Sequence, residues 1–137
     1  MLRMLSSFVG AIILLSLLII VACVRSTFDW KLWPAIRRAK RQIREAARRR
    51  VANADVLSRQ GATRISPGYL SFCITTDTDK ERDLLREDPE LYKDFRHALA
   101  QAGYPTGTDP VVHLSIQSQE TVDRDYGGNW HEAAEYP

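Results

Sequence analysis

The first hydrophobic pattern in the chain is a long uncharged run from Met4 to Val24, whose centre is almost wholly aliphatic. A helix rises about 1.5 Å per residue, so this run would extend about 30 Å, the thickness of a bilayer's hydrocarbon core. The apolar part of a signal peptide is usually shorter, about 7–15 residues. We therefore predict a short N-terminal tail over 1–3 and a single transmembrane helix over 4–24.

The second pattern has the period of a helix. Small apolar residues recur every three or four positions after Pro34, a residue that suits the first turn of a helix. They are Ile36, Ala39, Ile43, Ala47, Val51 and Ala54. Basic residues and good helix formers fill the positions between them. This pattern predicts a basic amphipathic helix in a juxtamembrane region, 25–58, with an apolar stripe too thin to bury much area alone.

The third pattern alternates between apolar and polar residues in two short segments. Breakers at Gly61, Pro67 and Gly68 indicate a loop over 58–68. Residues 69–75 and 111–117 then read as half-buried strands, each with three apolar side chains on one face. These side chains are Leu70, Phe72 and Ile74 in the first strand, and Val112, Leu114 and Ile116 in the second.

Helix signals surround the second strand. Asp88-Pro89 reads as a cap and first turn, and Gly103 as a stop. The buried face between them would hold Leu91, Phe95, Ala98, Leu99 and Ala102. A shorter helix precedes it over 80–87, and Ser118 caps another that Gly127 and Gly128 end. The predicted fold class is α+β: a small β-α-α-β-α domain over 59–137, with helices on one face of the sheet. Residues 129–136 would form either an edge strand or a loose tail, so the third strand would come from this tail or from a partner chain.

Charge divides the chain into a basic part and an acidic part. Residues 1–50 hold eleven Lys and Arg against two acidic residues, and residues 51–137 hold eight against fifteen. Ten of the basic residues lie within 25–50, and only Arg3 precedes the apolar run. Basic residues next to a span stay on the cytoplasmic side. We therefore expect a bacterial inner-membrane protein with its N-terminus outside and its C-terminal domain in the cytoplasm.

The basic region also contains the residues expected at the membrane interface. Tryptophan favours the membrane–water boundary, and arginine and lysine attract anionic lipid head groups. The predicted interface residues are Trp30, Trp33, Arg37, Arg38, Lys40, Arg41 and Arg44. Pairing with a second copy through the apolar stripe and a plain spacer remain alternatives. Nucleic acid is disfavoured, because the aromatics are not interleaved with the basic residues.

Cys23 allows a second interpretation of the N-terminus. Ile20-Val21-Ala22-Cys23 resembles a bacterial lipobox, in which the cysteine would carry lipid on an exported protein. Export would carry ten cationic side chains across the membrane, against the topology rule. We interpret Cys23 as a residue in the last turn of the transmembrane helix, and we keep lipidation at Cys23 as the alternative.

Candidate chemistry is sparse. The chain has no phosphate-binding glycine loop, nucleophile elbow or C-x-x-C motif, and no two histidines have metal-ligand spacing. A small membrane-tethered enzyme using His113, Asp123 and His131 is the alternative to a non-enzyme. The two cysteines, 23 and 73, give no disulfide framework. We expect no metal and no cofactor.

The most distinctive short segment lies near the C-terminus. Tyr126, Gly127, Gly128, Asn129 and Trp130 combine aromatic rings with a tight turn, a composition common in recognition surfaces and also in ordinary packed turns. With the uncovered sheet face, this turn is the candidate surface for a protein partner or a second copy. The sequence therefore favours a membrane-anchored binding, regulatory or accessory protein.

Overall fold

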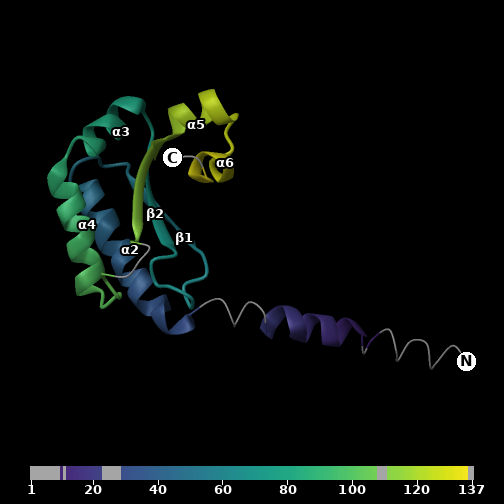
Figure 1. Cartoon of the computed structure of the whole chain (residues 1–137). Coiled ribbons are helices and arrows are strands. Elements are labelled where there is room, and N and C mark those ends of the chain that lie inside the picture. The colour runs from purple at the N-terminus through teal and green to yellow at the C-terminus, as the bar shows by residue number, and fades with distance from the viewer. Residues whose placement is uncertain (1–9, 11, 23–28, 108–110, 136–137) are drawn as a thin grey trace, which may run out of the picture.

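The computed structural model describes residue 10 and residues 12–22, 29–107 and 111–135 (Figure 1). Residues 12–22 are helical. The rest of the predicted 4–24 span lies outside the described residues, namely residues 4–9, 11, 23 and 24, and this includes Cys23. Among the helices of the described residues, none has both the length and the apolar character that a membrane span requires.

From Trp30 onward the chain has a mixed α+β architecture with a three-stranded sheet (Figure 1). The strand order is β1-β2-β3, with β1 antiparallel to β2 and β2 parallel to β3. Parallel neighbours need a crossover connection, which α3 and α4 supply. The elements are η1 (Trp30–Leu32), α2 (Trp33–Arg48), β1 (Asp55–Gln60), β2 (Leu70–Thr76), α3 (Asp79–Arg86), α4 (Pro89–Gln101), β3 (His113–Ser118), α5 (Gln119–Tyr126) and α6 (Trp130–Glu135).

The predicted β-α-α-β-α order is present as β2, α3, α4, β3 and α5, with the predicted caps. The Asp88 side chain accepts a hydrogen bond from the Glu90 amide at 2.9 Å, and Pro89 begins α4. After α4 ends, Gly103 takes a φ of 74°, a left-handed conformation that favours glycine. All five residues predicted for the inner face of α4 are buried. Local signals therefore located these elements correctly.

The third strand comes from a place that the sequence pattern assigned to a helix and a loop. Residues 55–57 were predicted to continue the basic helix and residues 58–60 to begin the loop; both predictions are wrong, because α2 ends at Arg48 and β1 follows. In β1, Val56 is 1% exposed whereas Leu57 is 44% exposed, the alternation of a strand. The register sets Leu57 opposite Cys73, so pairing with β2 decides the conformation of this segment.

The C-terminal tail is also corrected. The expected edge strand or loose tail is instead the short helix α6, packed against α5. The Asn129 side chain accepts hydrogen bonds from the amides of His131, at 3.1 Å, and Glu132, at 3.4 Å. These are the free amides of a first helical turn, so Asn129 caps α6.

The apolar stripe of α2 faces the interior of the fold. Figure 1 shows α2 and α4 together on one face of the sheet, and α2 packs on both α4 and β1. Every member of the predicted stripe is buried, and Ala39, Ile43 and Ala47 are completely so. On the other side of this core, the rings of Phe72 and Phe95 meet edge to face with centroids 6.0 Å apart. The packed unit therefore includes α2, ahead of the predicted domain start at residue 59.

A polar network joins the N-terminal ends of α3 and α5. The Asp79 carboxylate accepts hydrogen bonds from the hydroxyls of Ser118 and Thr121, the latter at 2.6 Å. Arg82 and Arg124 each donate to the same carboxylate at 2.9 Å. The Ser118 and Thr121 hydroxyls, then Arg124, hold the pKa of Asp79 far below its usual range. Two helix ends that are distant in sequence are thereby joined by one side chain.

Replacing Asp79 with Asn should lower the thermal midpoint at pH 7 and flatten its dependence on pH. A carboxyl with a lowered folded-state pKa stabilises the fold fully above its unfolded pKa, about 3.9, and loses that effect as the pH falls through the folded value. Thermal scans from pH 7 down to pH 2 measure this. Asp83→Asn is the control, since the Asp83 carboxylate pairs with the adjacent Arg82 and is more exposed than the Asp79 carboxylate. Equal midpoints for the two variants at pH 7 would contradict the assignment.

Candidate functional site

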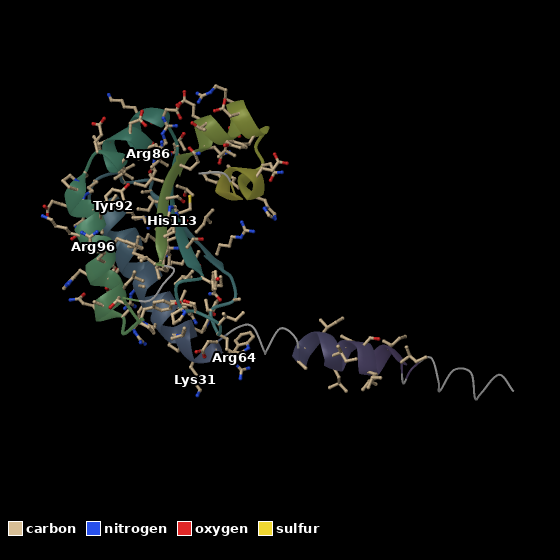
Figure 2. All side chains as sticks on the ribbon, in the orientation of Figure 1. Lys31, Arg64, Arg86, Tyr92, Arg96 and His113 are labelled. Carbon is tan, nitrogen blue, oxygen red and sulfur yellow. The ribbon has the colours of Figure 1, made fainter. Side chains whose placement is uncertain are left out.

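A basic cleft of about 610 Å³ runs along α2 and reaches the edge strand β1. It contains six of the seven residues predicted for the membrane interface; the seventh, Trp30, lies in η1 and is 57% exposed. The lining residues are Trp33, Pro34, Ile36, Arg37, Arg38, Lys40, Arg41, Arg44 and Ser58. Figure 2 shows two further basic residues, Lys31 and Arg64, near the Trp33 end of α2.

The helical period explains why these cations form a row. Arg37, Lys40, Arg41 and Arg44 are spaced three or four positions apart, so their side chains neighbour one another on the helix surface. From Arg37 to Arg44 the row covers about 10 Å of helix axis. The buried stripe of α2 turns toward the core, which leaves this flank facing outward along β1.

The cations of the cleft differ in how far their charge is compensated. Arg44 forms an ion pair with Asp55 at 2.6 Å, and Arg38 donates to the backbone oxygen of Ala102 at 2.9 Å. Burial opposes ionisation of Asp55, but the Val56 amide and Arg44 outweigh it and hold the pKa of Asp55 below its usual value.

Three cleft cations lack acidic partners. Within the described residues, Arg37, Lys40 and Arg41 form no ion pair with an Asp or Glu. The centre of the row therefore carries uncompensated positive charge.

The backbone adds positive potential at the Trp33 end. The N-cap of α2, Leu32, provides no side-chain hydrogen bond to the first turn, and that turn holds no acidic residue. The Trp33 amide donates to the Trp30 oxygen and Pro34 has no N–H, so this end contributes through the partial positive charge of the helix dipole. An anion in the cleft would thus meet the side-chain cations and the positive end of α2 together.

The edge strand supplies polar groups on the opposite wall. Gly61 donates from its amide to the Tyr69 oxygen at 2.7 Å, which continues the β1–β2 register by one pair. Hydrogen-bonded pairs alternate in an antiparallel ladder, so the backbone groups of Val56, Ser58 and Gln60 point outward. Consistent with this, the Val56 amide bonds to the Asp55 side chain, at 2.8 Å, instead of to β2. Ser58 therefore brings a hydroxyl and an outward amide to the cleft.

The arginines at the C-terminal end of the basic run form contacts within the fold. Arg48 donates to the Ala54 oxygen at 2.9 Å, and Arg50 pairs with Asp88 and, at 3.1 Å, with Asp94. These contacts link the C-terminal end of α2 to the residue before β1 and to the N-terminal part of α4. The basic run is thus divided into a cleft-lining half and a structural half, a division that the sequence pattern alone does not reveal.

The predicted partner-binding turn joins α5 to α6. Gly127 ends α5 in the left-handed conformation, with a φ of 57°. Trp130 is half-buried and donates from its indole N–H to the Gln119 side chain at 2.8 Å. Tyr126 is also half-buried, whereas Gly127, Gly128 and Asn129 are exposed. The aromatic rings pack on the fold, and the exposed part of the turn is small and polar.

The three residues of the enzymatic alternative are dispersed. His113 begins β3 and Asp123 lies in α5, after the other end of that strand, which is about 17 Å long. The Asp123 carboxylate accepts from Gln119 at 2.7 Å, and His131 lies on α6. No cluster of three or more His, Cys, Asp or Glu side chains with metal-binding geometry occurs in the part of the chain that the structure describes.

The face of the sheet opposite α2 and α4 is partly open, as expected for the two predicted strands. Pairing adds β1 to it and arranges the side chains in three rows across the strands. The rows are Arg59–Ser71–His113, Leu57–Cys73–Ser115 and Asp55–Thr75–Gln117. Burial raises the pKa of the Cys73 thiol, which is half-buried and forms no disulfide. The side chains in these rows are mostly polar, with one exposed leucine, Leu57.

Comparisons with family models, with curated proteins and with solved structures give no match for the chain.

Proposed function

We propose that this protein is a single-pass membrane-anchored binding protein of regulatory or accessory type, with its α+β domain in the cytoplasm. The apolar run over 4–24 serves as the anchor, and the basic cleft faces the anionic head groups of the inner leaflet. The observation that carries this proposal is the grouping of Arg37, Lys40 and Arg41, which have no acidic partner among the described residues, beside two exposed tryptophans on the part of the domain that follows the apolar run.

Energetics support this orientation. A basic residue near an anionic membrane surface contributes about 1 kcal/mol, and tryptophan favours the interfacial region. Trp30 and Trp33 remain 57% and 42% exposed, although large aromatic side chains usually pack inside a fold. Contact with the bilayer would cover both rings while the cations meet lipid phosphates.

A binding role follows from anchoring and from the surfaces left open. Confinement to a membrane raises the effective concentration of a domain for other membrane-bound partners. The open sheet face and the exposed part of the α5–α6 turn are the surfaces proposed for a protein partner or a second copy. A catalytic role receives no support from geometry, because His113, Asp123 and His131 do not converge.

Topology can be tested with reporters fused after Pro137 of the full chain. Green fluorescent protein should fluoresce at that position, and alkaline phosphatase should be inactive, because the phosphatase needs an oxidising compartment to form its disulfides. The same reporters at the N-terminus provide the opposite control. Strong phosphatase activity after Pro137 would overturn the cytoplasmic placement.

Lipidation is tested separately at Cys23. The Cys23→Ser variant should keep its membrane attachment, and the unmodified chain should show the mass of the sequence with no added lipid. Release of the variant from membranes, together with a lipid mass on the wild-type chain, would replace the transmembrane anchor with a lipoprotein anchor.

A further inference from the structure

We propose that the basic cleft binds one lipid whose head group carries two phosphates joined through glycerol, a lipid of the cardiolipin type. This inference rests on the proposed membrane function and specifies its lipid partner. It differs from a diffuse attraction to any anionic surface, since it requires a concave site with a defined number of charges.

The number of charges favours two phosphates. Arg37, Lys40 and Arg41 lack acidic partners in the described chain, and Arg38 has a single bond to a neutral backbone oxygen. A head group with one phosphate would leave most of this charge unpaired. Two phosphates would neutralise it more fully, and arginine can bind a phosphate with two parallel hydrogen bonds.

The length and walls of the cleft agree with a head group of this size. The cationic row covers about 10 Å of α2. At one end lie Arg37 and the first turn of α2, where the helix dipole places partial positive charge. Further along lie Lys40 and Arg41, with Ser58 on the β1 wall. Donors from a helix and from a strand converge on one space, whereas a flat basic surface would offer donors from one side only.

The apolar part of the cleft lies at the end of α2 that is nearer in sequence to the apolar run. Trp33 and Pro34 line the cleft at its N-terminal end, after the apolar run. A lipid held here by its head group could extend its acyl chains past Trp33 into the bilayer.

The groove between α2 and α4 is different, because Glu45 and Asp94 lie beside Arg49 there and reduce its net charge. The cleft holds five cations, of which Arg44 pairs with the Asp55 carboxylate, and this excess of positive charge distinguishes it from that groove.

The test uses the full chain reconstituted into phosphatidylcholine vesicles with either cardiolipin or phosphatidylglycerol, matched for total negative charge. The thermal midpoint of the domain is measured against lipid content. We expect saturable stabilisation, with half-saturation at about tenfold less cardiolipin than phosphatidylglycerol, both counted as charge.

A matched pair of double variants locates the effect. Arg37→Gln with Lys40→Gln should abolish the preference for cardiolipin. Arg96→Gln with Lys80→Gln removes the same charges from exposed positions on α4 and α3, and should preserve it. Equal loss in both pairs would show that total charge governs binding, and would overturn the proposed site.

The remaining outcomes separate this inference from the proposed function. Equal responses to the two lipids, or none, in a chain that stays in the vesicles would overturn the cleft assignment and leave the anchor intact. A chain absent from the vesicles would overturn both proposals. Displacement of the cardiolipin effect by low concentrations of inorganic pyrophosphate would identify a soluble bisphosphate as the preferred ligand, and would overturn the lipid assignment.

Discussion

Replacing Ile43 with Ala should lower the free energy of unfolding by about 2–5 kcal/mol, the usual cost of truncating a large buried aliphatic side chain. Ile43 is completely buried at the centre of α2, in the core shared with α4 and the sheet. If α2 were instead a separate juxtamembrane helix, the same change would be neutral or favourable, because Ala has the higher helix propensity. The size of the effect therefore reports whether α2 belongs to the packed domain.

Urea unfolding of the detergent-solubilised full chain, followed by circular dichroism, measures the effect. Arg41→Ala is the control two positions earlier on the same helix; its side chain is exposed, and we expect a change within about 0.5 kcal/mol. A loss below about 0.5 kcal/mol for Ile43→Ala would contradict the packing of α2 into the core.

Arginine at both Leu14 and Leu18 should move the protein from the membrane fraction to the soluble fraction. Each arginine at the centre of a span costs about 2.5–3.5 kcal/mol, and each leucine lost contributed about 0.5 kcal/mol in the favourable direction. Together the two changes would reduce membrane insertion by more than about a hundredfold. In the helix over 12–22 these leucines are 65% and 59% exposed, so they support no packed core that the substitutions could disrupt.

Fractionation after a carbonate wash measures this shift. Leu14→Ile with Leu18→Ile is the control, since it preserves the apolar character, and it should remain in the membrane. Retention of the double arginine variant in washed membranes would show that something other than the apolar run holds the chain there, such as a lipid on Cys23.

Much of the fold could be predicted from local signals. Asp88-Pro89, Gly103 and Ser118 mark helix ends through contacts within a few residues, so their meaning does not depend on the rest of the chain. The alternation around Phe72 likewise located β2 and its buried face. These elements needed no knowledge of their neighbours.

The segment that became β1 shows where local signals fail. Val51 and Ala54 continue the helical period of α2, and the adjacent apolar residues Val56 and Leu57 show no alternation in the sequence. They alternate only in their burial within the fold. Helix propensity favoured a longer helix, whereas backbone pairing with the edge of β2 opposite β3 favoured a strand. A pattern of residues along the chain does not show whether a segment will pair with a strand distant in sequence.

Six of the seven residues predicted for the membrane interface line one cleft, and their contact with a membrane stays a prediction. The sequence pattern predicted a membrane-interface role for five of the basic residues and assigned no separate role to Arg48, Arg49 and Arg50. Arg50 pairs with Asp88 and Asp94, which lie more than thirty positions further along the chain. Arg48 donates a hydrogen bond to the Ala54 oxygen. Which cations remain available for a ligand depends on these long-range contacts.

By itself, the sequence determined the elements whose causes are local: capped helices, alternating strands, and a basic stretch following an apolar run. Only the tertiary structure decided that α2 forms part of the core, that residues 55–60 complete the sheet, and that five basic residues of α2 line one cleft. The physical reason is that burial, strand pairing and ion pairing are interactions between segments distant in sequence, and their energies are set when those segments meet.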